Sequence, residues 1–211
     1  MKYLYQPPRF VQNIFRSFAW HSTKEKILLT FDDGPNPATT EKILRVLIEE
    51  NIQGLFFCVG NNVKRYPELA KILVNAGHTL GNHTFHHRVI TKLTTAVFRS
   101  EILTTNQVIE ETTGVKPKYF RPPYGRFNFN LSSRLSEFHL KSVMWTLLPY
   151  DYKNDAKVVK FAIKNYLTRN SVVVLHDSDK SAAVISDTIK YLAEEVRIKN
   201  FQFGTPEECL N

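Results

Sequence analysis

Cysteine is scarce in this chain of 211 residues. Only two occur: Cys58 lies inside the apolar run 55–59, and Cys209 lies near the carboxyl end. This usage excludes a small scaffold held by disulfides and a zinc site built from cysteine pairs, since both need clustered cysteines. We therefore expect two buried, unpaired thiols.

Long hydrophobic runs are also missing. No apolar stretch reaches the 18 residues of a transmembrane helix, and Lys2, Arg9 and Arg16 interrupt the region where a secretory signal would lie. This pattern predicts a cytoplasmic protein, with export by an unrecognised route as the alternative. Apolar residues at helical spacing within 10–18 favour packing on the domain, with peripheral contact with an anionic membrane as the alternative.

Basic side chains outnumber acidic ones but do not cluster. The chain has 28 Lys and Arg against 20 Asp and Glu, a formal net charge of +8. No basic run with interleaved aromatic residues occurs, so nucleic acid is not an expected partner. The excess fits a solvated basic surface, or attraction to an anionic polymer such as a glycan. With 43% hydrophobic residues and no low-complexity segment, we expect one domain at 25–211 after an N-terminal extension at 1–24.

Short β-like runs alternate with helical segments from Ile27 onward, which predicts an α/β fold with a parallel sheet. The expected strands are 27–31, 54–59, 78–81, 119–121, 142–145, 172–175 and 201–203. The expected helices are 40–50, 67–75, 94–113, 156–167 and 181–199. This alternation fits either a barrel or a doubly wound sheet.

Chemically unusual residues gather directly after four of the expected strands, where parallel α/β folds place their active sites. Asp32 and Asp33 follow the first strand and point in different directions, so that one carboxylate can bind a metal while the other acts as a base. They would equally suit a turn. His83 and His87, four residues apart on an expected helical turn, can bind one divalent cation, and His86 has workable spacing too.

The two remaining clusters supply a stiff loop and an imidazole. Two prolines and a glycine in 121–125 can present a backbone N–H and a positioned guanidinium, although a structural turn would look the same. His176 ends a strongly β-forming strand, where a histidine near a metal can serve as a general acid.

Taken in order, these clusters resemble the polysaccharide deacetylase family, also called the NodB homology domain or carbohydrate esterase family 4. The matching motifs are Thr-Phe-Asp-Asp-Gly-Pro at 30–35, His-Thr-x-x-His at 83–87, Arg-x-Pro-Tyr-Gly at 121–125 and Leu-His at 175–176. The resemblance runs from about Ile27 to the carboxyl end. It implies a distorted (β/α) barrel with about seven parallel strands.

The resemblance also implies an activity and a cofactor. The expected enzyme is a metal-dependent hydrolase that removes N-acetyl groups from GlcNAc-type amino sugars in a glycan or oligosaccharide. Asp33, His83 and His87 would hold the divalent metal, with Zn²⁺ expected first and Co²⁺ or Ni²⁺ as alternatives.

The remaining roles follow the same resemblance. Asp32 would be the catalytic base oriented by Arg121, and His176 the acid that protonates the leaving amine. The backbone N–H of Tyr124 would help to hold the oxyanion. The implied substrate-binding residues are Leu175, which would line the pocket for the acetyl methyl group, Tyr124, Trp145 and Asp151.

One motif departs from the family pattern. Many members carry Asp-x-x-Asp-Trp, but here Leu148 stands at the first Asp and Tyr152 at the Trp. The missing carboxylate is the one expected to tune His176, and either Asp151 or Asp177 is predicted to replace it. Two alternative functions stay open: hydrolysis of O-acetyl esters or non-sugar amides, and non-catalytic glycan binding.

Overall fold

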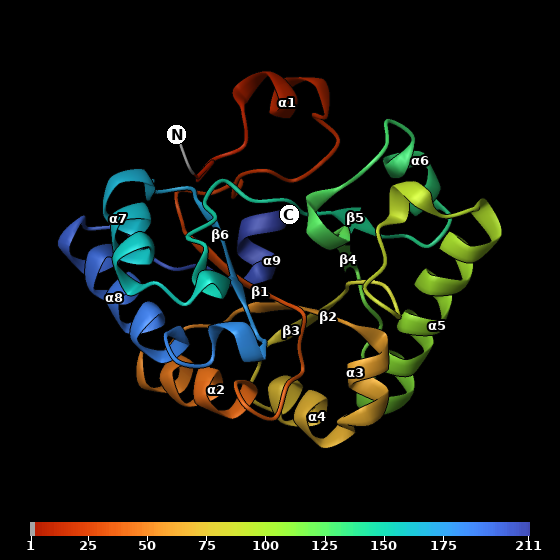
Figure 1. The fold of residues 1–211 in the computed structure, drawn as a ribbon, viewed down its shortest axis with the longest axis horizontal. Helices are drawn as coiled ribbons and strands as arrows, with labels where there is room; N and C mark the ends of the chain where they lie inside the picture. Colours follow the sequence, from red (N-terminus) through yellow and green to blue (C-terminus); the bar gives the residue numbers. More distant parts are fainter. Residues whose placement is uncertain (1–2) are drawn as a thin grey trace.

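The computed structural model describes residues 3–211, which form a split barrel of parallel strands surrounded by helices (Figure 1). Its six-stranded sheet has the order β5-β4-β3-β2-β1-β6, and every neighbouring pair is parallel. The strands are β1 (Leu28–Asp32), β2 (Leu55–Cys58), β3 (Thr79–Asn82), β4 (Tyr119–Phe120), β5 (Lys141–Ser142) and β6 (Val172–His176). The predicted distorted barrel is thereby confirmed, with six strands in place of about seven.

The expected seventh strand at 201–203 is reduced to one bridge, between Phe203 and Ile27. The chain cannot extend this pairing, because Thr205 caps a new helix and Pro206 occupies its first turn. That helix is α9 (Pro206–Leu210).

The five predicted helices all form. They are α2 (Thr40–Glu49), α4 (Pro67–Asn75), α5 (Thr95–Thr113), α7 (Ala156–Tyr166) and α8 (Ile185–Ile198). Local chemistry marks their ends: the Thr94 hydroxyl caps the start of α5, and Gly114, with φ 73°, ends it. Three further short helices are α1 (Arg9–Ile14), α3 (Gly60–Arg65) and α6 (Leu131–Ser136).

The two faces of the strands pack against different parts of the molecule. Leu29 and Phe31 of β1 belong to the large hydrophobic cluster shared with the surrounding helices. Leu28 faces the barrel interior, and Thr30 and Asp32 share its side of the strand because side chains alternate. The interior thus changes along β1 from apolar at the amino end to charged at the carboxyl end.

Helix α9 fills the apolar end of the barrel interior. Its Cys209 and Leu210 pack with residues at the amino ends of three strands, Leu28, Leu55 and Val172. Both cysteines of the chain are buried and free. This plug leaves only the carboxyl ends of the strands available for a site.

The gap between the edge strands β5 and β6 is bridged by irregular chain. Leu147 forms a bridge with Val173 of β6, and Ala19 forms one with Val143 just beyond β5. Phe18 and Trp20 flank Ala19 and are only 4% and 5% exposed. The amino-terminal segment is therefore part of the wall that closes the barrel.

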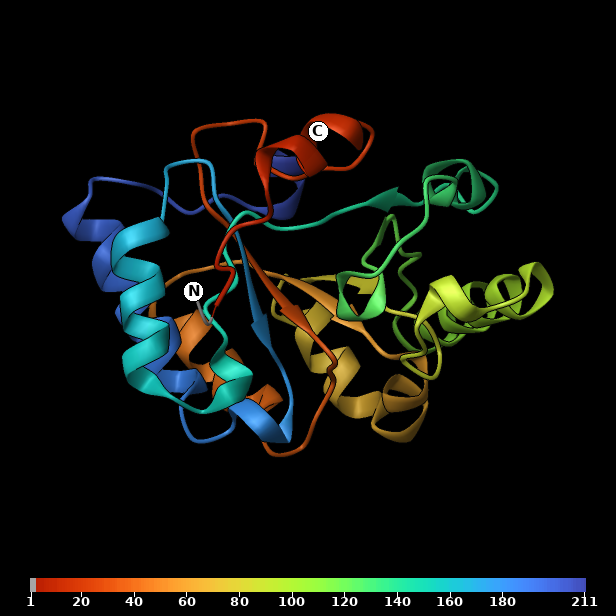
Figure 2. The same ribbon diagram turned by 45° about the horizontal axis from the view of Figure 1, so that its top comes forward.

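Helix α1 lies at the periphery, outside the strands (Figures 1 and 2). Its Phe10 and Ile14 are exposed, so the stripe noted in the sequence is only partly buried. Within residues 3–211, no helix is long and apolar enough to cross a membrane.

Candidate active site

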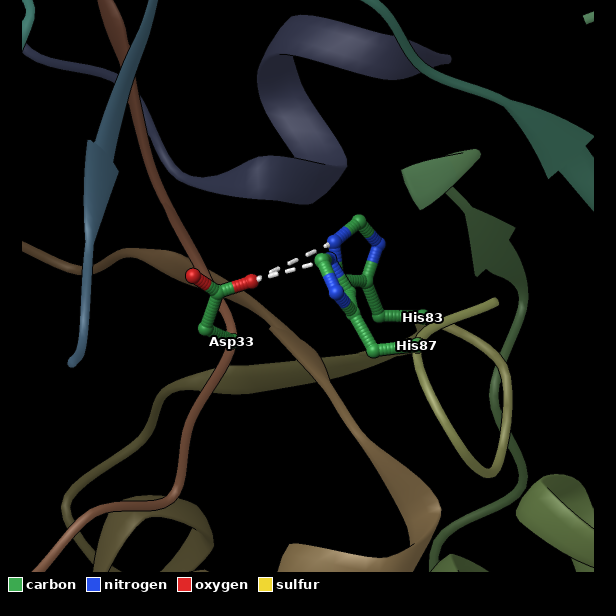
Figure 3. Close-up of side chains that lie close together, drawn as sticks. All are labelled: Asp33, His83 and His87. Carbon is green, nitrogen blue, oxygen red and sulfur yellow. Dashed lines mark ion pairs between the residues drawn. The ribbon is translucent and has the colours of Figure 1, made fainter. Parts of the chain in front are cut away.

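Asp33, His83 and His87 converge at the carboxyl end of the barrel (Figure 3). Their ligand atoms all lie within 4.8 Å of one another. Asp33 Oδ1 is 3.2 Å from Nε2 of His87 and 3.7 Å from Nε2 of His83. One divalent cation could contact all three.

The two histidines come from a loop after β3, so the predicted helical turn is wrong. Residues 84–87 are not helical, and both Thr84 and His87 have positive φ, 63° and 54°. These backbone conformations are uncommon for residues with a side chain and turn both imidazoles toward Asp33. Asp33 also has positive φ, 80°, directly after β1.

Two members of the cluster, His83 and Asp33, also have pKa shifts that suit cation binding. His83 is buried, its Nδ1 lies 2.7 Å from the backbone oxygen of Arg121, and burial lowers its pKa. A neutral ring that donates from Nδ1 presents a lone pair at Nε2. Burial acts against the charge of Asp33, but the hydrogen bond with His87 and the nearby His176 hold its pKa well below the usual range. A carboxylate and neutral imidazoles are the ligands that Zn²⁺ and similar ions use.

Asp32 is held by a guanidinium that is fully buried. Arg121 Nη1 donates to Asp32 Oδ1 at 2.8 Å and to the Thr30 hydroxyl at 2.7 Å. Its other nitrogens donate to the backbone oxygens of Val143 and Met144. Arg121 therefore fixes one carboxylate oxygen, which leaves the other free to accept a proton.

His176 is held by Asp151 through two hydrogen bonds. Asp151 Oδ1 lies 2.8 Å from Nδ1 of His176, and its Oδ2 accepts the His176 backbone N–H at 2.7 Å. Burial alone would lower the pKa of His176, but the charge and hydrogen bond of Asp151, together with Asp33 and Asp32, raise it to about 9. A pKa this high favours the protonated imidazole, and His176 lines the cavity described below.

Asp177, the other carboxylate considered for tuning His176, points elsewhere. It accepts hydrogen bonds from the hydroxyls of Thr39 and Thr40, and burial raises its pKa to about 7. Of the two predicted carboxylates, Asp151 is therefore the one that bonds to the His176 side chain.

A cavity of about 340 Å³ opens beside these groups. It is lined by Asp32, Asp33, His83, His87, Tyr124, Gly125, Trp145, Leu148, Tyr152, Val174, His176 and Lys180. The expected placement of Leu175 is wrong: its side chain lies in the outward-facing core, and Val174 lines the cavity instead. Asp151 is fully buried, bonds to His176 and is not among the residues that line the cavity, so its expected contact with substrate stays a prediction.

The loop after β4 forms one wall of this cavity. Tyr124 has φ 60°, its ring lies 4.6 Å from that of His87, and 63% of the residue is exposed. Gly125 has φ 63°, and a Cβ there would lie 2.4 Å from Trp145 Cη2. A residue without a side chain is therefore required where the loop meets Trp145.

Two of the residues that line the cavity, Val174 and Lys180, were not predicted from the sequence. Val174 was predictable, because side chains alternate along a strand and it lies two residues before His176. Lys180 had no local signal, since it lies in a single turn of 3₁₀ helix, Asp179–Ser181, between β6 and α8. Tyr152, already noted as a departure from the family motif, packs edge-on against the His176 ring at 4.7 Å.

The split parallel barrel, the Asp-His-His cluster and the separate acid and base candidates define a site that could hold a metal and catalyse hydrolysis. Comparison with known proteins narrows this class. The sequence model of the family described as polysaccharide deacetylase matches residues 21–143. The chain belongs to this family, whose catalytic members are hydrolases that act on N-acetyl groups.

Relatives support the same assignment. The chain is 29% identical, over 94% of its length and 73% of the relative, to a peptidoglycan-N-acetylglucosamine deacetylase of Bacillus cereus. It is 34% identical to the peptidoglycan-N-acetylmuramic acid deacetylase PdaC of Bacillus subtilis, over 77% of this chain but only 34% of that protein. The chain thus corresponds to one part of some larger relatives.

Solved structures agree with the fold. The Bc1960 peptidoglycan N-acetylglucosamine deacetylase superposes with a TM-score of 0.88 at 27% identity and covers 97% of both chains. A mutant of BA3943, described as a pseudoenzyme of carbohydrate esterase family 4 with restored activity, superposes with a TM-score of 0.81 at 26% identity, over 92% of this chain and 70% of that one. A member of this family can therefore lack activity, and the residues of its site decide whether it is active.

Proposed function

We propose that this chain removes N-acetyl groups from the amino sugars of a peptidoglycan-type glycan, using a divalent cation, with Zn²⁺ as the first expectation. The observation that carries the proposal is the complete set of groups around one cavity: a cation site, a base candidate held by Arg121 and an acid candidate held by Asp151. Relatives with named activities on N-acetylglucosamine and N-acetylmuramic acid support the substrate class.

Asp33, His83 and His87 would hold the cation. When bound there, a divalent ion supplies Lewis acidity to the amide carbonyl and favours ionisation of water. The protein residues then have to move two protons and hold the substrate in place.

Asp32 serves as the base in this proposal. Its Oδ2 is the oxygen that Arg121 does not bind, and it removes a proton from the attacking water. The Arg121 bond keeps the carboxylate oriented without competing for that oxygen. The Tyr124 backbone N–H, on the loop that forms the cavity wall, is the proposed donor to the oxyanion.

His176 serves as the acid. It remains protonated near neutral pH because Asp151 raises its pKa, and it delivers a proton to the amide nitrogen as the C–N bond breaks. Acetate and a free amine are the products. Val174 and Leu148 supply the apolar surface beside this position that suits an acetyl methyl group.

Two alternatives use the same site. The alkoxide of an O-acetyl ester depends less on a proton donor than the leaving nitrogen of an amide does. A His176 that Asp151 keeps protonated therefore favours the amide. Non-catalytic glycan binding does not require a fully buried Arg121 paired with Asp32, since burying the guanidinium costs desolvation and Arg121 does not line the cavity.

The test is product analysis on four substrates: N-acetylglucosamine oligomers, peptidoglycan fragments with N-acetylmuramic acid, acetylated xylan, and a non-sugar acetamide. We expect acetate and free amine in equal amounts from one or both amino sugars. The Asp32→Asn variant should lower the turnover by about 10²–10⁴ while it still binds cation and glycan. Release from xylan alone would support the esterase, and binding without any release would support the non-catalytic function.

A further inference from the structure

Glu101 is a buried carboxylate on α5 that takes no part in the chemistry described so far. It is 4% exposed and lies in the middle of the helix, away from the cavity-lining residues. Burying a carboxylate is unfavourable unless several donors compensate for the lost water. The identity of those donors indicates its role.

All of the close donors come from the loop that carries the histidine ligands. Glu101 Oε2 accepts the backbone N–H groups of Phe85 and His86, each at 2.8 Å. Its Oε1 lies 2.8 Å from Nδ1 of His86, and Arg88 Nε is 3.7 Å away. One side chain thus holds two consecutive peptide groups between the ligands His83 and His87.

This loop needs such support because its conformation is unfavourable. Thr84 and His87 both have positive φ, which costs of order 1–3 kcal/mol at each such residue unless the surroundings impose it. The Asn82 side chain holds the Thr84 N–H, and the Gly60 and Asn61 amides bond to the carbonyls of residues 84 and 85. Among the hydrogen bonds of residues 3–211, Glu101 is the only acceptor for the two backbone N–H groups between Thr84 and His87.

We infer that Glu101 is a positioning residue for the cation site. It fixes the strained loop so that His83 and His87 are already directed at Asp33 before the cation binds. His86 is the histidine of the motif that does not belong to the cation site, and its Nδ1 orients the Glu101 carboxylate. This inference rests on the proposed cation dependence, and its test is separate from turnover.

A series of substitutions at Glu101 tests the inference through Zn²⁺ affinity of the metal-stripped protein. We expect Glu101→Ala to weaken Zn²⁺ binding about tenfold or more, within the range known for groups that orient ligands. Glu101→Asp keeps the charge but is shorter by one methylene, so we expect a similar loss. Glu101→Gln keeps one oxygen for both backbone N–H groups, so it should recover most of the affinity.

Glu195→Ala is the matched control. Glu195 is also a buried glutamate, 7% exposed, but it lies on α8 and bonds to the Tyr191 hydroxyl. It should lower thermal stability without changing Zn²⁺ affinity. The absorption spectrum of Co²⁺ bound to each variant adds a second readout, which should change for Glu101→Ala and Glu101→Asp alone.

The outcomes separate this inference from the proposed function. If Glu101→Ala does not fold, the Asp and Gln variants decide alone, and equal wild-type affinity in both would overturn the inference. Equal loss of affinity in Glu195→Ala would also overturn it, because general destabilisation would then explain the effect. Failure of the wild-type protein to bind Zn²⁺ would instead count against the proposed function.

Discussion

At the scale of single residues, the site depends on partners that hold each functional group in one state. Arg121 fixes one oxygen of Asp32, and Asp151 keeps His176 charged. Both partners are fully buried, so neither can exchange its bond for water. The candidate base and the candidate acid are thus each held by a buried partner of their own.

The substitution Asp151→Asn should shift the alkaline side of the pH–activity profile. His176 must be protonated to act as an acid, so activity falls as the pH rises through its pKa, which Asp151 raises to about 9. Removing that charge lowers the pKa, and we expect the alkaline limb of kcat/KM to move to lower pH by about one to three units. The measurement is kcat/KM across the pH range.

Asp177→Asn provides the comparison for that profile. Asp177 follows His176 directly but bonds to Thr39 and Thr40, and asparagine can still accept one of those bonds. Its alkaline limb should remain where the wild-type limb lies. A limb that moves with Asp177 and not with Asp151 would reverse the assignment of the tuning carboxylate.

At the scale of elements, the sequence predicted regular structure better than loops. The apolar runs 27–31 and 172–175 and the periodic helices were recognisable because strand and helix periods are local properties. The loop 84–87 was mistaken for a helical turn, since its positive φ values are imposed by distant groups such as Glu101. The outward placement of Leu175 likewise depends on which face of β6 meets the helices.

The loop after β4 gives a prediction of its own. Gly125→Ala would place a Cβ against the Trp145 ring, in a backbone conformation that disfavours side chains. We expect a loss of about 1–3 kcal/mol in the free energy of unfolding and a raised KM, because Trp145 lines the cavity. Chemical denaturation and steady-state kinetics measure the two effects.

Gly114→Ala separates strain from the clash. Gly114 has a similar φ of 73°, but no atom lies within 4 Å of an added Cβ. It should cost some stability and leave KM unchanged. A raised KM in this variant, or an unchanged one in Gly125→Ala, would argue against the loop as a substrate-contacting wall.

At the scale of the whole molecule, the barrel is closed by chain that is not part of the sheet. Helix α9 fills one end, and the segment around Ala19 lies beside the edge strand β5. A parallel sheet leaves its edge groups unpaired unless something covers them, and here the amino-terminal segment does so. The sequence indicated a helical stripe in this segment but not where it would pack, because that depends on residues more than a hundred positions away.

Phe18→Ala should therefore destabilise the whole barrel. Phe18 is 4% exposed within a cluster of aromatic side chains, and truncating such a residue costs about 3–5 kcal/mol. Phe10→Ala, at a position 66% exposed on α1, should change the free energy of unfolding by about 0.5 kcal/mol or less. Urea denaturation measures both changes. If Phe18→Ala lowers the free energy of unfolding as little as Phe10→Ala does, the segment does not stabilise the barrel as described.

The central claim is that the Asp33, His83 and His87 cluster holds the cation on which amide hydrolysis depends. The most direct measurement is acetate release from an N-acetylated amino-sugar oligomer by the metal-stripped protein, before and after Zn²⁺ is added, with His83→Ala treated in the same way. The account predicts no release without metal, recovery with Zn²⁺ in the wild-type protein, and no recovery in the variant. Release that continues after metal removal, or that His83→Ala leaves unchanged, would contradict it.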